Sequence, residues 1–219
     1  MIRVAVLNAK GGVGKTTIAT ALAVRAARDF HMVGLVDLDP QQGAARWHGH
    51  RRVGDDASPQ LFKVADSAAD TAEALELAGY EVAIFDGAPG SLSQTEDAIQ
   101  AATLVLVPLR AGDQDLASTE YVVSACRDFG VPYLLVLNEA ASLRDKRALE
   151  VLGGFKSIGE PICETMICRR VHYVDGINMG RSAAELRGGE KAAEEIDAVW
   201  RDITRRITAH ESVRVRHAG

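Results

Sequence analysis

The chain has 219 residues, of which 47% are hydrophobic and 25% are charged, a composition typical of a folded globular protein. No apolar run approaches the ~18 residues of a membrane-spanning helix, and no signal peptide precedes the first apolar run, so we expect a cytoplasmic protein without a membrane span. The formal net charge of −5 excludes a uniformly basic protein. The charges are uneven, however, since residues 64–109 contain no lysine or arginine and residues 201–219 contain five arginines against two carboxylates.

The predicted elements alternate between short apolar runs and amphipathic helical stretches, a pattern typical of a doubly wound α/β fold. Most of the apolar runs lack polar alternation, as expected of parallel strands buried on both faces. In chain order, strands are predicted at residues 2–7, 32–37, 61–64, 82–86, 104–107, 133–137 and 158–162, and helices at residues 15–29, 41–51, 68–78, 94–101, 116–129, 143–155 and 191–209. We expect one domain over residues 1–219 with a mostly parallel sheet, helices on both faces and a flexible tail at residues 210–219.

The three cysteines do not have the spacing of a metal site. Cys163 and Cys168 lie five positions apart, but no second cysteine pair or histidine pair completes a ligand set. We therefore expect Cys126, Cys163 and Cys168 to be free, buried thiols in a reducing compartment.

Residues 10–17, Lys-Gly-Gly-Val-Gly-Lys-Thr-Thr, directly follow the first predicted strand and its apolar end. Glycines allow successive backbone amides to converge on one anion, and the N-terminus of the next helix adds a partial positive charge. Lys15 is placed to reach the β- and γ-phosphates of a nucleotide, and the Thr16 hydroxyl to bind Mg²⁺. The loop residues predicted to contact ATP are Lys10, Gly11, Gly12, Val13, Gly14, Lys15, Thr16 and Thr17. Asn138, which follows the sixth predicted strand, is predicted to hydrogen-bond the edge of the adenine.

Lys10 distinguishes this loop from the ordinary pattern G-x-x-x-x-G-K-[ST], which has glycine where this chain has Ala9. Two lysines aimed at one phosphate would repel each other. The repulsion is avoided if Lys10 projects outward and reaches the nucleotide of a second copy, which predicts an ATP-dependent homodimer. The alternative is a solvated loop lysine.

Three aspartates follow predicted strands and are candidates for metal and water chemistry. Asp86 ends an apolar strand and is predicted to hold a water bound to Mg²⁺, with Asp37 in the outer shell of the same ion. Asp39 is predicted to orient the attacking water. The alternative for Asp39-Pro40 is a helix cap followed by proline in the first turn. Residues 87–91 are either a loop that senses the γ-phosphate or an ordinary strand-to-helix turn.

Together, residues 10–17, the Asp37-Leu38-Asp39-Pro40-Gln41 segment and the Asp86 strand resemble the ParA/MinD group of deviant Walker ATPases. The chain length, Trp47, the Asp86-Gly87-Ala88 and Ser91-Leu92-Ser93 segments and residues 169–174 resemble the short ParF-like ParA proteins in particular. The resemblance extends from Ile2 to about Leu186.

This resemblance implies a deviant P-loop NTPase fold with ATP and Mg²⁺ as cofactors. It implies that Lys10 bridges an ATP sandwich dimer, and that Lys15 and Asp39 act with it in weak ATP hydrolysis. It further implies that the ATP-loaded protein binds nucleoid DNA without sequence preference, and that a ParB-like or adaptor protein on a cargo stimulates hydrolysis. No helix-turn-helix segment precedes the first strand, so we expect no operator binding.

Non-specific DNA binding requires several cations near phosphates rather than a net positive protein. The candidates are Arg169, Arg170, Arg181, Arg201, Arg205 and Arg206. Arg201 and Arg205 are one helical turn apart, with Arg206 beside them, and are expected to form one patch. The alternative is that these arginines are solvated or paired with Asp202, Glu194 or Glu195.

Two other function classes are alternatives to a DNA-binding positioning ATPase. A MinD-like membrane-associated regulator of division would need a C-terminal amphipathic helix with bulky apolar residues, whereas residues 203–216 contain no Phe, Leu or Trp. A metabolic ligase or reductase component would need a substrate pocket or cluster cysteines, and the sequence indicates neither. We expect a protein that is not bound to membranes.

Overall fold

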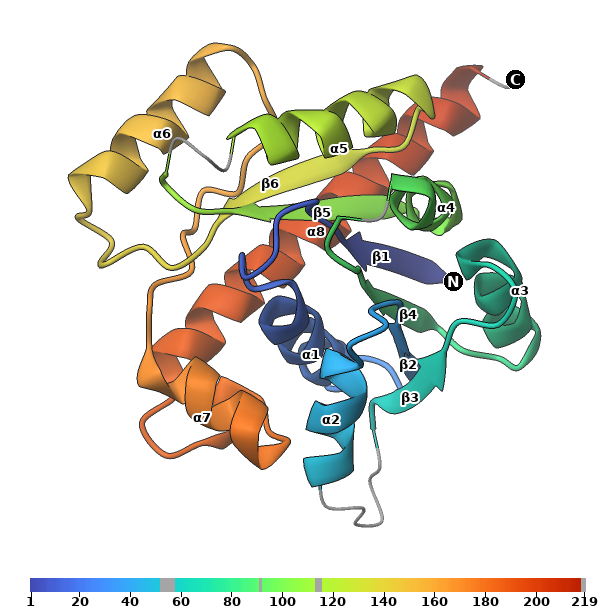
Figure 1. The fold of residues 1–219 in the computed structure, drawn as a ribbon. Helices are drawn as coiled ribbons and strands as arrows, with labels where there is room; N and C mark the ends of the chain where they lie inside the picture. The colour runs from blue at the N-terminus through green and yellow to red at the C-terminus, as the bar shows by residue number, and fades with distance from the viewer. Residues whose placement is uncertain (52–57, 91, 113–115, 218–219) are drawn as a thin grey trace.

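A six-stranded sheet forms the centre of the computed structural model, which describes residues 1–51, 58–90, 92–112 and 116–217. Its strands are β1 (Ile2–Val6), β2 (Val33–Asp37), β3 (Gln60–Lys63), β4 (Val82–Asp86), β5 (Leu104–Leu109) and β6 (Tyr133–Leu137). They lie in the order β3-β2-β4-β1-β5-β6, and each pair is parallel (Figure 1). Since chain order reverses beside β1, this is the doubly wound sheet that the sequence predicts.

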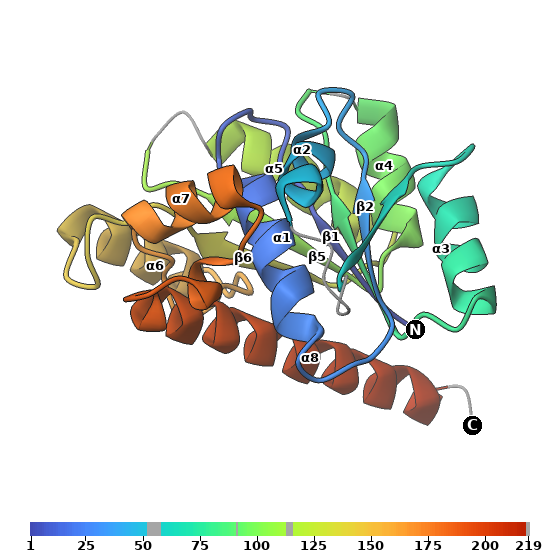
Figure 2. The ribbon, with the colours of Figure 1, turned by 90° about the horizontal axis from the view of Figure 1, so that it is seen from below.

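Helices cover both faces of the sheet (Figure 2). One face packs against α1 (Lys15–Ala26), α2 (Gly43–His50), α7 (Val171–Met179) and α8 (Glu190–His217), with the short 3₁₀ helix η2 (Ala183–Glu185) between the last two. The other face packs against α3 (Ala68–Leu77), α4 (Leu92–Ala101), α5 (Leu116–Asp128) and α6 (Lys146–Ser157). The predicted α/β fold with helices on both faces is therefore confirmed.

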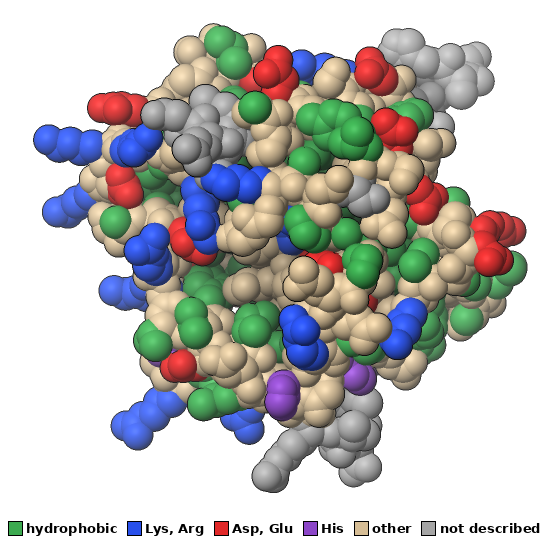
Figure 3. Space-filling view, viewed as in Figure 1, with side chains coloured by type: hydrophobic (Ala, Val, Ile, Leu, Met, Phe, Trp, Pro, Cys, Tyr) green, Lys and Arg blue, Asp and Glu red, His purple; other side chains and the backbone are tan. Residues whose placement is uncertain are grey.

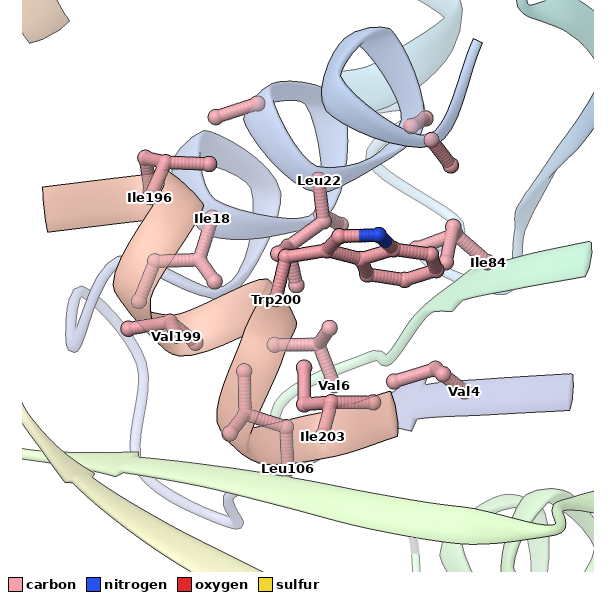
Figure 4. Packing of buried hydrophobic residues seen from close by; sticks show 14 of the residues in the cluster. Val4, Val6, Ile18, Leu22, Ile84, Leu106, Ile196, Val199, Trp200 and Ile203 are labelled. Carbon is pink, nitrogen blue, oxygen red and sulfur yellow. The ribbon is translucent and has the colours of Figure 1, made fainter. Parts of the chain in front are cut away.

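The long helix α8 holds α1 against the sheet. The indole of Trp200 is buried between Leu22 of α1 and Ile84 of β4 (Figure 4). The indole nitrogen donates a hydrogen bond to Asp29 Oδ2 at 3.3 Å, so its polar atom is satisfied while the ring stays in the core. Because α1 begins at the glycine-rich loop, this packing fixes the base of the candidate site.

The strand predicted at residues 158–162 is absent. Gly159 has a φ of 77°, which an extended strand does not allow, and Pro161 has no amide hydrogen to donate to a ladder. Only an isolated bridge between Ile162 and Leu135 of β6 remains. The segment instead closes against the edge of the sheet through single hydrogen bonds.

Two C-terminal features differ from the sequence-based expectation. Helix α7 was not predicted, because Gly176 and the β-branched Val171 and Val174 weaken its helical signal. It ends in a left-handed glycine, Gly180, whose φ is 66°. Helix α8 continues to His217, past the predicted end at residue 209, so the expected flexible tail is helical up to that residue.

The cysteine prediction is confirmed, since Cys126, Cys163 and Cys168 are free and buried. Burial raises the pKa of each thiol, to about 12 for Cys126 and about 11 for Cys168, which makes them poor nucleophiles. Within the ranges that the structure describes, no helix combines the length and the apolar character needed to cross a bilayer.

Candidate functional site

The predicted site residues meet at the carboxyl edge of the sheet. Asp37 and Asp86 are register partners at the ends of β2 and β4, and Asp86 is also the register partner of Val6 at the end of β1. The glycine-rich loop leaves β1 at this point and enters α1 (Figure 1). Open parallel sheets bind ligands at this edge, next to the reversal in strand order.

Two glycines give the loop its shape. Gly12 and Gly14 have φ values of 77° and 96°, a conformation that other residues rarely adopt. A Cβ on Gly14 would also lie 2.1 Å from Nδ2 of Asn138. Gly14 is the N-cap of α1 and no side chain caps the helix, so the first amides of α1 are left for another acceptor. An anion is the natural occupant of such a helix N-terminus.

Lys15 is folded over this loop. Its side chain is buried, and its ammonium group donates a hydrogen bond to the carbonyl oxygen of Lys10 at 2.9 Å. Burial lowers the pKa of Lys15, while the charges of Asp86 and Asp39 act in the opposite direction. A positive side chain therefore lies between the loop and the carboxylates, as a phosphate-binding lysine requires.

The start of the loop is fixed by Asn8, which the sequence reasoning missed. Asn8 is buried, accepts a hydrogen bond from the Lys10 amide at 2.9 Å and donates one to the carbonyl of Pro108 at 2.9 Å. It thereby ties the loop to the end of β5. The side chain of Lys10 is partly exposed at this edge.

Asp86 is a buried acceptor whose two carboxylate oxygens have no hydrogen-bond partner among the described residues. Burial raises the pKa of Asp86 to about 7, and the nearby Thr16 hydroxyl and the charge of Lys15 only partly oppose this effect. Buried polar atoms are almost always satisfied, so this exception indicates a missing partner.

The donor set fits a hydrated Mg²⁺ ion. Mg²⁺ prefers oxygen ligands, keeps several waters and needs few protein groups when it also binds phosphates. The Thr16 hydroxyl and the orphaned oxygens of Asp86 provide such oxygens at one place. Within the described part of the chain no cluster of three or more His, Cys, Asp or Glu is placed to hold a metal by itself.

The Asp37 carboxylate accepts backbone hydrogen bonds from the segment that leads into α2. Its oxygens accept hydrogen bonds from the amides of Asp39 at 3.0 Å and Ala45 at 2.8 Å. Burial raises the pKa of Asp37, with these amides acting against the rise. Asp37 therefore anchors the loop into α2, and any role in the outer shell of a metal would be in addition to this.

Asp39 forms a tight turn rather than a helix cap. Its Oδ1 accepts a hydrogen bond from the Gln41 amide at 2.8 Å. Helix α2 begins at Gly43 with Gln42 as its N-cap, so the helix-cap interpretation and the predicted start at residue 41 are wrong. The charge of Asp39 raises the pKa of Lys15 and so opposes the effect of burial, which means that the two charges interact across the site.

The loop after Asp86 touches the glycine-rich loop directly. The Gly90 amide donates a hydrogen bond to the Ala9 carbonyl at 3.0 Å. A Cβ on Gly11 would lie 3.8 Å from Pro89. This contact favours the interpretation of residues 87–90 as a nucleotide-sensing loop, while Ser91 lies outside the described residues.

A cavity of about 350 Å³ opens beside the loop, with Gly14, Thr17, Asn138, Glu139, Arg169 and Tyr173 in its wall. Its position next to the phosphate loop makes it the candidate pocket for a nucleoside. Asn138 is buried, and its amide nitrogen donates to the Val13 carbonyl at 2.7 Å. This amide nitrogen therefore supports the loop, and the predicted contact of Asn138 with adenine remains a prediction.

The arginines predicted to bind DNA do not share one environment. Arg170 donates to both carboxylate oxygens of buried Glu195, at distances of 2.5 to 3.2 Å, so its charge is compensated. Arg169 is 76% exposed and lies 3.5 Å from Glu139 at the cavity. Arg181 is exposed beyond the end of α7.

The other three arginines lie on α8. Arg201, Arg205 and Arg206 are all exposed, and Arg205 pairs with Asp202 at 2.8 Å. The paired interpretation thus holds for Arg170 and in part for Arg205. Figure 3 shows that basic side chains gather over the flank formed by α6 and α7, whereas acidic side chains lie over α3 on the opposite flank.

The buried charge of Asp86 leads to a testable prediction about stability. Between its ordinary pKa of 3.8 and the folded value of about 7, the folded protein holds a proton that the unfolded chain has lost. The stabilisation by protonated Asp86 is therefore complete below about pH 4 and lost as the pH rises through about 7.

Asp86→Asn removes this dependence, because asparagine stays neutral. In thermal unfolding without nucleotide, we expect similar melting temperatures for the variant and the wild type near pH 4, and a higher melting temperature for the variant at pH 8. A difference between the two proteins that does not change with pH would contradict this account.

Comparisons with known proteins agree with this site. Residues 4–58 match the family model described as the CobQ/CobB/MinD/ParA nucleotide binding domain. The chain is 31% identical to the maintenance of carboxysome distribution protein A of Gloeobacter kilaueensis, over 90% of this chain and 95% of that protein.

Two further proteins are similar to this chain, the first in sequence and the second in fold. The chromosome-partitioning ATPase Soj of Thermus thermophilus is 29% identical, over 84% of this chain and 87% of its own length. The septum site-determining protein MinD of Pyrococcus horikoshii, solved with Mg-ADP, has the same fold with a TM-score of 0.72 at 16% identity, over 92% of this chain and 95% of that one.

Proposed function

Because this chain belongs to the ParA/MinD family of P-loop ATPases, we propose that it is a ParA-type positioning ATPase that dimerises on ATP and binds DNA without sequence preference. In this proposal, hydrolysis stimulated by an adaptor protein releases the dimer and moves a cargo over the nucleoid. The observation that carries the proposal is the glycine-rich loop that begins with Lys10 and meets the orphaned carboxylate of Asp86.

The binding step follows from the loop. The amides of residues 11–16 and the N-terminus of α1 surround the β- and γ-phosphates, and Lys15 moves from the Lys10 carbonyl to a phosphate oxygen. The residues that would hold Mg²⁺ are Thr16 and, through water, Asp86 and Asp37. When bound, Mg²⁺ would supply positive charge that neutralises the charge developing on the phosphates.

The hydrolysis step needs a water in line with the γ-phosphate. Asp39, whose charge acts on the pKa of Lys15, orients this water and accepts its proton, while the released phosphate leaves the dimer interface. Lys10 reaches the phosphates of the facing copy, so each active site is complete only in the dimer. The attraction between Lys10 of each copy and the phosphates bound to the other copy then holds the copies together.

The names of the relatives support cargo positioning as the purpose of this cycle. One relative is named for carboxysome distribution and another for chromosome partition. Because these relatives are named for different cargoes, we infer that a ParB-like or adaptor protein is the partner that selects the cargo of this chain. Nucleoid association then follows from DNA binding rather than from a membrane anchor.

The test compares DNA and membrane binding under the same nucleotide conditions. Mobility shifts on random-sequence DNA and pelleting with anionic liposomes are each measured with ATP, with ADP and without nucleotide. We expect ATP-dependent DNA binding and no pelleting. ATP-dependent pelleting without a DNA shift would instead identify a MinD-like membrane-associated regulator.

The arginines of α8 provide a sharper test of the DNA interface. Replacing Arg201, Arg205 and Arg206 by alanine is expected to weaken DNA binding equally for all sequences. A plot of log affinity against log salt concentration has a negative slope, and each lost phosphate contact reduces the magnitude of this slope by about 1. Arg127→Ala on α5 is the matched control, because this arginine is also exposed and paired with a carboxylate. Equal salt slopes for the triple variant and this control would exclude α8 as the interface.

A further inference from the structure

Two side chains hold the outer carbonyls of the glycine-rich loop. Nη2 of Arg110 donates a hydrogen bond to the carbonyl of Gly12, and Nδ2 of Asn138 donates one to the carbonyl of Val13 at 2.7 Å. These are consecutive peptide groups of the loop. The arginine follows β5 directly and the asparagine follows β6, so both donors come from the carboxyl ends of neighbouring strands.

These two contacts also fix the direction of the backbone amides that follow Gly12 and Val13, because the peptide bond is planar. In a trans peptide the carbonyl of one residue and the amide of the next point in opposite directions. The described part of the chain has its one cis bond at Ser58-Pro59, so the loop peptides are trans. Because the Gly12 and Val13 carbonyls face Arg110 and Asn138, the amides of Val13 and Gly14 face away from these two side chains. Successive amides that face one way, with their carbonyls occupied elsewhere, are what a phosphate needs.

The position of Arg110 is itself fixed from two sides. The backbone amide of Asn138 donates a hydrogen bond to the Leu109 carbonyl at 2.8 Å, which ties the segment before Arg110 to the end of β6. Glu139 pairs with Arg110 through its carboxylate and lies 3.5 Å from Arg169. Glu139 has a φ of 57°, a left-handed conformation that is uncommon for glutamate. Such local strain is found where a side chain must be aimed.

We propose that Arg110 is a positioning residue for ATP binding, which holds the Gly12 peptide so that the Val13 amide faces the phosphates. Glu139 orients the guanidinium group, and Asn138 does the same work one peptide further along the loop. This inference rests on the proposed ATPase function and adds a group that the loop motif itself does not contain. Arg110 acts through the loop backbone rather than by touching the reacting atoms.

The test replaces Arg110 by methionine, which keeps an apolar stem and removes the donors. Arg127→Met is the matched control, because Arg127 also pairs with one glutamate, Glu160, but at the amino end of β6. The dissociation constants of ATP and ADP are measured by displacement of a fluorescent nucleotide. Loss of one charge-assisted hydrogen bond predicts roughly tenfold weaker binding for Arg110→Met and no change for Arg127→Met.

Two conservative variants distinguish positioning from a general loss of structure. Arg110→Lys keeps a charged donor for the Gly12 carbonyl and is expected to recover most of the affinity. Glu139→Gln leaves the Gly12 contact but loosens the guanidinium, so we expect roughly twofold weaker binding. In steady-state kinetics, we expect the KM of Arg110→Met to rise while its kcat changes less. Without nucleotide, the melting temperature of Arg110→Met is expected to be similar to that of Arg127→Met.

The outcomes separate this inference from the proposed function. A wild-type protein that binds no nucleotide would refute the ATPase proposal and this inference with it. A wild-type protein that binds ATP, together with an Arg110→Met variant of equal affinity, would overturn only the role of Arg110. Weak binding in Arg110→Met without recovery in Arg110→Lys would also overturn it.

Discussion

Replacing Asp39 by alanine is expected to lower steady-state ATP turnover by about 10²- to 10⁴-fold, the contribution typical of a positioned acid or base. The charge of Asp39 acts on the pKa of Lys15, and its carboxylate closes a local turn by accepting a hydrogen bond from the Gln41 amide. The turn is partly exposed, so the variant should fold. ATP affinity is expected to stay within about twofold, because binding depends on the loop amides and Lys15.

The measurement is phosphate release at saturating ATP, with nucleotide affinity measured in parallel. A variant that binds ATP and does not hydrolyse it should also remain on DNA, because the ATP-bound dimer is not released. Asp66→Ala is a matched control, since Asp66 is an exposed carboxylate in the segment that follows β3. Turnover of Asp39→Ala equal to that of this control would remove Asp39 from the mechanism.

Replacing Lys10 by alanine is expected to abolish the ATP-dependent dimer while ATP remains bound to the monomer. The loop of one copy keeps its amides and Lys15, so nucleotide affinity should change little. Removing one member of a charge pair at an interface costs about 2–5 kcal/mol, which weakens the dimer by roughly 30- to 5,000-fold.

This prediction is measured through the dependence of turnover on protein concentration. Wild-type specific activity should rise with concentration as dimers form, whereas Lys10→Ala should show a low activity that does not change with concentration. Lys63→Ala at the end of β3 is the matched control for loss of an exposed lysine. A normal rise in the specific activity of Lys10→Ala would assign this lysine to solvent.

Much of the fold could be predicted because its signals are local. A strand buried on both faces is a continuous apolar run, and β2 and β4 are read from such runs together with the aspartates that end them. The glycine-rich loop was predictable because the left-handed conformations of Gly12 and Gly14 restrict these positions to glycine. Asp37 and Asp86 could be predicted to lie at one sheet edge because both end parallel strands, whose carboxyl ends share an edge.

The parts that were missed depend on contacts between distant segments. Helix α7 is the exception and was missed for a local reason, because Gly176 weakens its helical signal; glycine is needed there since a Cβ would lie 2.7 Å from the nearby Arg181 carbonyl. Arg110 and Asn8 gain their roles only when β5 and β6 lie beside the loop. The pairing of Arg170 with Glu195 joins α7 to α8, and no local pattern distinguishes it from a solvated charge.

The hydrogen bonding of Asp86 and Lys15 within the chain predicts how ligand binding is linked to stability. Asp86 is buried without a hydrogen-bond partner, and Lys15 occupies a backbone carbonyl. A hydrated cation on Asp86 and a phosphate on Lys15 would satisfy both groups at once. We therefore expect Mg²⁺ and nucleotide to stabilise the protein together more than the sum of their separate effects.

The proposed ATPase cycle requires that two copies of this chain enclose two ATP molecules. The decisive measurement is the mass in solution by light scattering, with Mg²⁺ and either a non-hydrolysable ATP analogue or ADP. We expect one chain of 23.4 kDa with ADP and twice that mass with the analogue. A protein that is saturated with the analogue and keeps the mass of a single chain at every concentration would refute the dimer and the bridging role of Lys10.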